Sequence, residues 1–231
     1  MLLFGLDTAT LTLSAALVER QAGVDRLLSR EVIEPPTPHS SVLPALVARM
    51  LESAGRKPSD LTAVVIGLGP GSFTGLRIGL ATAKGLCYAA SIPLCGASSL
   101  AAMALAASAE LPEDTLLVPC LDARKGEVYA GFWRRRGAEL VADGPEVAIG
   151  PAALVERLVG AKAEVFGIGR EAYPPLASLE PPRTRIRTPD AAALLALVRE
   201  LPTWSKQAVF ALEPHYVRPS DSEWTAKPKK H

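Results

Sequence analysis

The sequence predicts an α/β protein of two lobes, and three observations support this prediction. Apolar runs typical of strands alternate with helical patterns through the first half of the chain. A second group of short strands begins near Thr115, after a polar, proline-bearing stretch at 109–114. The 231 residues are 48% hydrophobic, which is enough for a sizeable core. We therefore expect an N-terminal lobe over residues 1–110 and a C-terminal lobe over residues 111–231.

The first lobe is expected to combine an antiparallel meander with parallel strands. Its expected elements are strands at 2–7, 11–18 and 25–33, a helix at 39–54, a strand at 62–66, a helix at 73–90 and a strand at 92–95. The prolines of 34–38 exclude a helix there, and His39–Ser41 offers a capping residue for the first helix, which Gly55 ends. This order places the meander on one edge of a partly parallel sheet, the layout of ribonuclease H-like, actin-type domains.

The second lobe is expected to begin with a hairpin around the turn 122–126. Its expected elements are strands at 116–121 and 127–133, short strands near Leu140 and Val147, a helix that starts at Pro151, and a buried strand at 164–167. The two blocks do not repeat at a fixed spacing along the sequence.

The glycine-dense segment GLGPGSFTGLRIG at 67–79 joins a buried strand to a long helix. Such a turn can bind an anion, because unpaired N–H groups and the helix dipole point at the ligand. A Walker loop would need a closing lysine, and a dinucleotide fingerprint would need a third glycine where Thr74 stands. A nucleophile elbow, GxSxG, would need glycines two residues before and after Ser72, where Pro70 and Thr74 stand. Because all three patterns fail, the alternative is a tight turn that packs the helix closely on the sheet.

Composition excludes several classes of protein. A net charge of +1 and a pI near 7.7 provide no general attraction to nucleic acid or membrane. The start MLLFGLDTAT is too short and lacks the basic residues of a signal peptide. Three cysteines lie apart in apolar segments, and three histidines are widely separated, so we expect reduced thiols, no metal site and a cytoplasmic protein.

The chain resembles the TsaB (YeaZ) family, which takes part in making threonylcarbamoyladenosine beside tRNA anticodons. The matching segments are LDTAT at 6–10, HS at 39–40, GPGSFTGLRIGLATAKGL at 69–86, DARKGEVY at 122–129 and EPHYVR at 213–218. The resemblance implies an actin-like two-lobe fold, a homodimer when alone, and a heterodimer with the related protein TsaD, which performs the carbamoyl transfer. It also implies a ternary complex with TsaE, and tRNA as an indirect partner. The old glycoprotease label of the family has no support in this sequence.

The nucleotide site of actin-type ATPases is degenerate in this chain. Asp7 keeps the carboxylate that holds hydrated magnesium in those ATPases, but no glycine follows it in the turn. Asp122 supplies a second carboxylate, and Arg124 stands where a phosphate would pass. The residues of this vestigial site are Asp7, Thr8, Thr10 and Asp122. We expect no cofactor of the chain itself, with ATP bound weakly or only at an interface within the complex. The alternative is that Asp7 caps its own turn as an Asx-turn residue.

Noncatalytic binding and activation of TsaD is therefore the expected function; the alternative is an independent nucleotide-binding or ATP-hydrolysing enzyme of the actin-like fold. The residues expected to bind a partner are His39, Val42, Leu43, Leu46, Met50, Phe73, Leu76, Gly79, Leu80 and Ala83. Packing inside the chain is the alternative for these helices, whose glycines Gly79 and Gly85 require close approach of another element. The arginines at 134–136 and 183–187 could contact tRNA, although solvated surface is the default for short basic runs.

Overall fold

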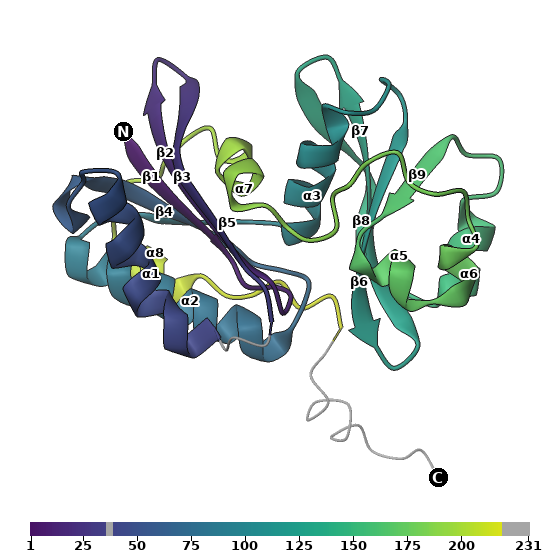
Figure 1. Cartoon of the computed structure of the whole chain (residues 1–231), viewed down its shortest axis with the longest axis horizontal. Helices are drawn as coiled ribbons and strands as arrows, with labels where there is room; N and C mark the ends of the chain where they lie inside the picture. Colours follow the sequence, from purple (N-terminus) through teal and green to yellow (C-terminus); the bar gives the residue numbers. More distant parts are fainter. Residues whose placement is uncertain (36–38, 219–231) are drawn as a thin grey trace, which may run out of the picture.

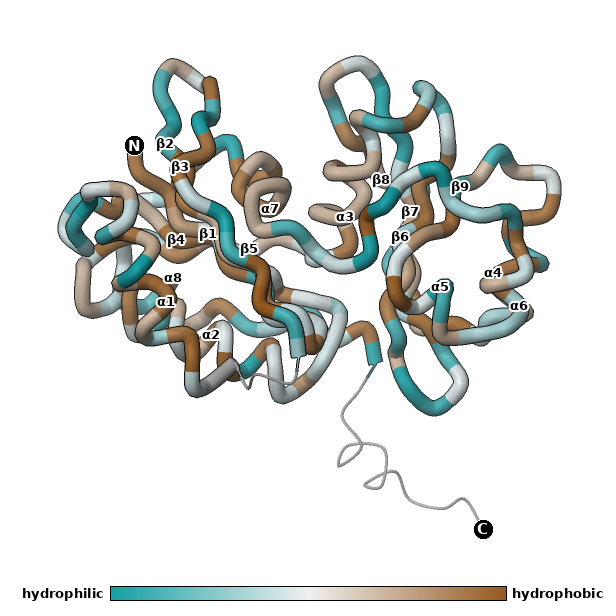
Figure 2. Tube along the Cα trace, viewed as in Figure 1, coloured by the Kyte–Doolittle hydropathy of each residue, from teal (hydrophilic) through white to brown (hydrophobic). Residues whose placement is uncertain are grey.

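The computed structural model describes residues 1–35 and 39–218 of the chain. Two lobes lie side by side, each built on one β-sheet that helices cover (Figure 1). The central strands of both sheets are mainly apolar (Figure 2), as expected for strands that are buried on both faces. Trp224 and the basic residues 227–230 of the tail lie outside the described residues.

The first sheet has the strand order β3-β2-β1-β4-β5. Its strands are β1 (Leu2–Asp7), β2 (Leu13–Gln21), β3 (Val24–Ile33), β4 (Leu61–Gly67) and β5 (Leu94–Ala97). Strands β1, β4 and β5 run parallel, while β2 and β3 form the antiparallel meander at one edge. This topology confirms the ribonuclease H-like, actin-type prediction. Strand β2 starts two residues later than expected, because Thr10 Oγ1 and Thr12 close a hydrogen-bonded turn first.

Helices cover both faces of the first sheet. The two faces follow from alternation along β1, since Phe4 and Leu6 pack in one cluster with helices α1 (His39–Ser53) and α2 (Phe73–Ala90), while Leu3 packs in another with α7 (Ala191–Leu197). Helix α8 (Lys206–Ala211) packs with α1 and α2, and a 3-10 turn lies at Pro58–Asp60. Helix α3 (Ser99–Ser108) packs between α7 and the second sheet, against β6 (Leu116–Arg124) and β7 (Glu127–Arg136). Helices α7 and α8 belong to the far end of the sequence yet pack on the first lobe, so the lobes are not the two contiguous segments expected.

The second sheet has the order β8-β7-β6-β9, with β9 parallel to β6. Its elements are β6 (Leu116–Arg124), β7 (Glu127–Arg136), β8 (Glu139–Ile149), α4 (Pro151–Arg157), β9 (Ala163–Phe166), α5 (Ile168–Ala172) and α6 (Pro174–Ala177). The two short strands expected near Leu140 and Val147 are one strand, β8, whose register against β7 shifts near Phe132. The second lobe has the same order of elements as the first: the meander β6–β8, the helix α4 and the parallel strand β9 correspond to β1–β3, α1 and β4. Within the described residues, no helix is long and apolar enough to cross a membrane.

Candidate functional site

The glycine-dense segment packs against the turn that follows β1. Four of its glycines recur every fourth residue and share this contact: Gly67, Gly71, Gly75 and Gly79. A Cβ atom added to any of them would come within 1.9–2.2 Å of an atom of Asp7, Thr8 or Ala9. The backbone N–H of Ser72 also donates to the carbonyl of Ala9 at 2.7 Å. Close approach of backbone to the turn therefore explains the glycines, as the tight-turn interpretation expects.

Asp7 lies beneath this packing and its carboxylate is fully buried. Oδ1 accepts the backbone N–H of Ala9 at 2.8 Å, and Oδ2 accepts the hydroxyl of Ser99 at 2.6 Å. Burial raises the pKa of Asp7 to about 6, and the two hydrogen bonds oppose this shift. The bond to Ala9 makes the residue an Asx-turn, so the capping role is confirmed. Ser99 escaped sequence reasoning because it lies 92 residues away, at the start of α3.

The two threonines of the β1–β2 turn differ in environment. Thr8 is buried, and its Oγ1 has no hydrogen-bond partner within the described part of the chain. Thr10 uses its hydroxyl inside the turn, where Oγ1 donates to the carbonyl of Thr12 at 2.8 Å. Thr12 in turn donates its own hydroxyl to Glu34 at 2.9 Å. Among the described residues, the hydroxyls of Thr10 and Thr12 therefore have partners, whereas that of Thr8 has none.

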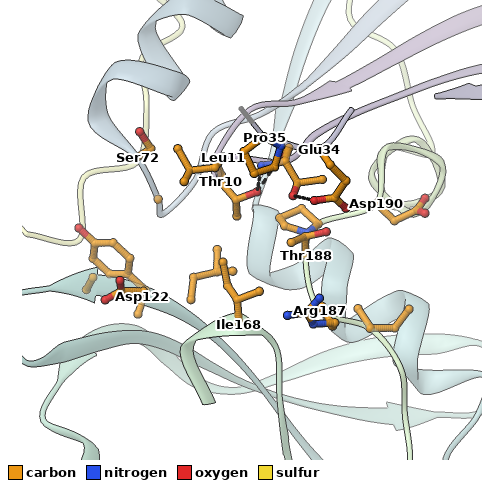
Figure 3. Close-up of a pocket in the computed structure, with 18 of the residues that line it drawn as sticks. Thr10, Leu11, Glu34, Pro35, Ser72, Asp122, Ile168, Arg187, Thr188 and Asp190 are labelled. Atoms are coloured by element: carbon orange, nitrogen blue, oxygen red, sulfur yellow. Dashed lines mark hydrogen bonds between the residues drawn. The ribbon is translucent and has the colours of Figure 1, made fainter. Parts of the chain in front are cut away.

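A cleft of about 660 Å³ separates the two lobes. Thr10, Leu11 and Glu34 face it from the first lobe, and Asp122 and Ile168 face it from the second (Figure 3). Of the four residues expected in a vestigial nucleotide site, Thr10 and Asp122 line opposite walls of this cleft. The other two, Asp7 and Thr8, are not among its lining residues. The structure therefore does not bring the four together.

Asp122 is already engaged by its own lobe. Its Oδ1 accepts the backbone N–H of Arg124 and the hydroxyl of Tyr173, each at 2.8 Å. Its Oδ2 lies 3.2 Å from the guanidinium of Arg124. Desolvation, followed by the hydrogen bond to Asp122, raises the pKa of the Tyr173 phenol. The carboxylate thus orders the β6–β7 turn.

Local carboxylates partner most of the basic residues predicted as candidates for tRNA contact. The pairs are Arg134 with Asp143, Arg135 with Glu113, Arg183 with Glu164, and Arg187 with Glu171. In the cleft, Arg30 pairs with Asp190, Arg124 with Asp122 and Arg218 with Glu127. Arg185 also lines the cleft and has no ion pair or hydrogen bond to the described residues. Contact with tRNA stays a prediction.

Most side chains expected to bind a partner lie in the core of the first lobe. The buried ones are Leu43, Leu46, Met50, Leu76, Leu80 and Ala83. Gly79 is buried against Thr8, Val42 is half-buried and Phe73 is exposed, while His39 begins α1. As packed here, the six buried side chains contact this chain and would meet no partner directly. Docking through α1 and α2 stays a prediction, and it must involve the other face of these helices.

Small residues occupy the outer face of α1 and α2. The exposed ones are Pro44, Ala45 and Ala48 on α1, and Ala81, Gly85 and Ala89 on α2. Gly85 has open space around it, with no atom within 4 Å of an added Cβ. Its expected contact with another element is therefore absent among the described residues of the chain. Sequence reasoning missed this face because it followed the large apolar side chains, which point inward.

The C-terminal segment 212–218 connects the two lobes. The backbone N–H of His215 donates to the carbonyl of Leu68 in the first lobe at 2.8 Å. The Nε2 atom of His215 lies 3.6 Å from Oε2 of Glu146 in the second lobe. Glu146 also accepts the hydroxyl of Ser98, and burial raises the pKa of this carboxyl. The ring of Tyr216 packs 5.3 Å from that of Phe73. No local pattern in the sequence signals these long-range contacts.

Within the described residues, no group of three or more His, Cys, Asp or Glu side chains is placed to hold a metal ion. The three cysteines are buried and form no disulfide.

Comparison with known proteins identifies the family. Residues 34–174 match a family described as "TsaD: tRNA N6-adenosine threonylcarbamoyltransferase". The tRNA threonylcarbamoyladenosine biosynthesis protein TsaB of Haemophilus influenzae is 31% identical over 98% of this chain and 97% of its own length. The Escherichia coli TsaB is 32% identical over 76% of this chain and 75% of its own.

A solved structure extends the likeness to the whole fold. A Pseudomonas aeruginosa protein, described as similar to peptidase YEAZ, superposes with a TM-score of 0.77 at 27% identity, covering 94% of this chain and 99% of its own. The sequence motifs, the actin-type topology and these relatives agree. The chain belongs to the TsaB (YeaZ) family, within the wider group whose shared model bears the name TsaD.

Proposed function

We propose that the chain is a noncatalytic partner that binds and activates TsaD in threonylcarbamoyl transfer to the adenosine next to the tRNA anticodon. Family membership supports a role in making threonylcarbamoyladenosine. The burial of Asp7 carries the noncatalytic part of the proposal. Its two oxygens are bonded to Ala9 and Ser99, and Gly67 packs against Oδ2 too closely for a Cβ, so the carboxylate holds the turn.

The proposed docking surface is the outer face of α1 and α2, defined by Pro44, Ala45, Ala48, Ala81 and Gly85. Glycine inside a helix costs about 1 kcal/mol relative to alanine. At Gly79 the close approach of Thr8 explains that cost, whereas at Gly85 nothing in the described chain does. A helix of a partner that packs over Gly85 would account for it, since small residues let backbones approach closely.

The same surface would serve in a homodimer and in a heterodimer. The family model named for TsaD matches residues 34–174, a range that includes both α1 and α2. A partner that shares this fold can meet the chain pseudo-symmetrically, much as a second copy would. The two assemblies then compete for one patch. TsaE would join the complex with TsaD in the cytoplasm. The complex would bind tRNA, and ATP would bind at an interface within the complex.

Gly85→Leu tests the surface. The leucine side chain enters open space in the free chain, so the chain should stay folded. In the complex it would clash with the closely packed partner, so binding to TsaD should weaken at least about tenfold. Binding is measured by calorimetry, and folding by circular dichroism. Ala153→Leu, on an exposed position of α4, is the matched control and should bind normally. Equal affinities for the two variants would show that this face does not meet TsaD.

A further inference from the structure

The segment 212–218, called the strap here, runs from the first lobe to the second (Figure 1). On the first lobe, the backbone N–H of His215 donates to the carbonyl of Leu68 at 2.8 Å. On the second lobe, the guanidinium of Arg218 pairs with Glu127 at 3.0 Å. The strap is therefore attached to both lobes, and a change in its contacts would change how firmly the lobes are held together.

A buried carboxylate of the second lobe lies between the strap and the first lobe. The side chain of Glu146, on β8, is only 12% exposed. Its Oε1 accepts the hydroxyl of Ser98, which also caps α3. Its Oε2 is buried with no hydrogen-bond partner among the described residues, and Nε2 of His215 lies 3.6 Å away. A buried acceptor without a donor is costly, and a protonated imidazole would supply a donor and a charge.

Other charged side chains on the elements around this contact have partners of their own or are exposed. Helix α3 carries none. The rest are Glu127, Arg134, Arg135 and Arg136 on β7, Glu139 and Asp143 on β8, Arg77 and Lys84 on α2, and Glu213 and Arg218 on the strap. Burial raises the pKa of the Glu146 carboxyl, while the hydrogen bond from Ser98 and the charge of His215 oppose this shift.

Asp7 titrates in an overlapping range, but in the first lobe. Ser99 follows Ser98 in the sequence, and its hydroxyl donates to Oδ2 of Asp7 at 2.6 Å. Burial raises the pKa of Asp7 to about 6. Its hydrogen bonds join it to Ala9 and Ser99, and none joins it to the strap. A substitution at His215 therefore separates an effect of the strap from an effect of Asp7.

We propose that His215 and Glu146 form a pH-dependent latch that holds the two lobes together and so restrains the opening of the inter-lobe cleft. Histidine side chains gain a proton between about pH 8 and pH 5, and here that proton gives the buried carboxylate a charged partner. Loss of the proton leaves Oε2 of Glu146 without a donor again, and the contact weakens. The inference concerns the motion of the lobes and goes beyond the role with TsaD.

Distances between two spin labels in the full chain test the latch. Val24→Cys at the start of β3 and Val159→Cys after α4 place one label on each lobe, and both positions are largely exposed. The three native thiols are buried, and burial raises their pKa, so the labels attach to the introduced cysteines. The width of the distance distribution, measured by double electron–electron resonance, should fall at least about 1.5-fold from about pH 8 to about pH 6, because latched lobes move less.

Substitutions at the latch make the test specific. His215→Ala and Glu146→Gln should each remove the pH dependence and keep the wide distribution. His215→Lys, which keeps a positive charge at both pH values, should give the narrow one throughout. Glu139→Gln, the same change at an exposed position of β8, should behave like the parent. A parent distribution that does not narrow, or a wide distribution in a folded His215→Lys chain, would overturn the proposal. So would narrowing that survives His215→Ala, which would assign the pH dependence to another group such as Asp7.

Discussion

Two identical substitutions in helix α2 should have opposite effects on stability. Alanine is favoured over glycine inside a helix by about 1 kcal/mol, and this gain applies to Gly79→Ala and Gly85→Ala alike. At Gly85 the new methyl enters open space, so the free energy of unfolding should rise by about that amount. At Gly79 it would lie 2.1 Å from Thr8 Oγ1 and 3.1 Å from both Cβ and Cγ2 of Thr8, so this buried threonine would have to shift.

Overpacking of this kind costs about 1–3 kcal/mol, so the two variants should differ by that margin in favour of Gly85→Ala. Urea denaturation followed by circular dichroism measures the difference. Thr8→Ala removes Oγ1, the closest atom, together with Cγ2, and it leaves no orphaned partner, since Thr8 Oγ1 bonds to none of the described residues. Gly79→Ala should therefore be tolerated in that background. Equal stabilisation at both glycines, or a penalty that Thr8→Ala does not relieve, would refute the close packing of the glycine segment on the β1–β2 turn.

Three further predictions concern buried polar and sulfur groups. The pKa of Asp7 rises from 3.8 to about 6 on folding, so the folded state binds this proton more tightly than the unfolded state. The free energy of unfolding therefore falls as pH rises through this window. Asp7→Asn should be more stable than the parent by about 3 kcal/mol at pH 8 and about equal to it below pH 4. Urea midpoints at both pH values test this, and an Asn variant that is less stable at pH 8 would contradict it. Burial raises the pKa of Cys87 and Cys120 to about 12, so native thiols should react with a disulfide reagent at least about 100-fold more slowly than unfolded ones; comparable rates would contradict their burial. Arg20→Met should lower the free energy of unfolding by about 3 kcal/mol in urea denaturation, because Arg20 pairs with Asp25 at 2.6 Å and donates hydrogen bonds to carbonyls at the end of α7. An unchanged free energy of unfolding would show that α7 needs no such anchor.

The sequence predicted the first sheet well because its signals are local. Alternation along 2–7 and 25–33, the prolines after them and the buried run at 62–66 each follow from nearby residues. The return of α7 and α8 to the first lobe was missed, since a short helix pattern does not reveal which sheet it covers. The two expected short strands are one strand, β8, because residues of low strand propensity inside it resemble a turn in the sequence.

The candidate site was predictable in its residues and less so in their roles. The glycines of 67–79 were correctly expected to serve close packing, but the partner of that packing is the turn after β1, which only the fold reveals. The large apolar side chains of α1 and α2 were expected to meet another protein, yet they fill the core. The hydrophobic effect favours burial of the same residues in either case, so periodicity alone cannot separate core from interface.

Reconstitution of threonylcarbamoyl transfer to tRNA tests the central proposal most directly. Product is measured with TsaD and TsaE present and with the chain omitted, added, or added as Asp7→Asn. We predict that product requires the chain and that Asp7→Asn supports transfer as well as the parent, because Asp7 holds a turn. Equal product without the chain would contradict the proposed partner role. Loss of product with a folded Asp7→Asn chain would show that this carboxylate takes part in the chemistry.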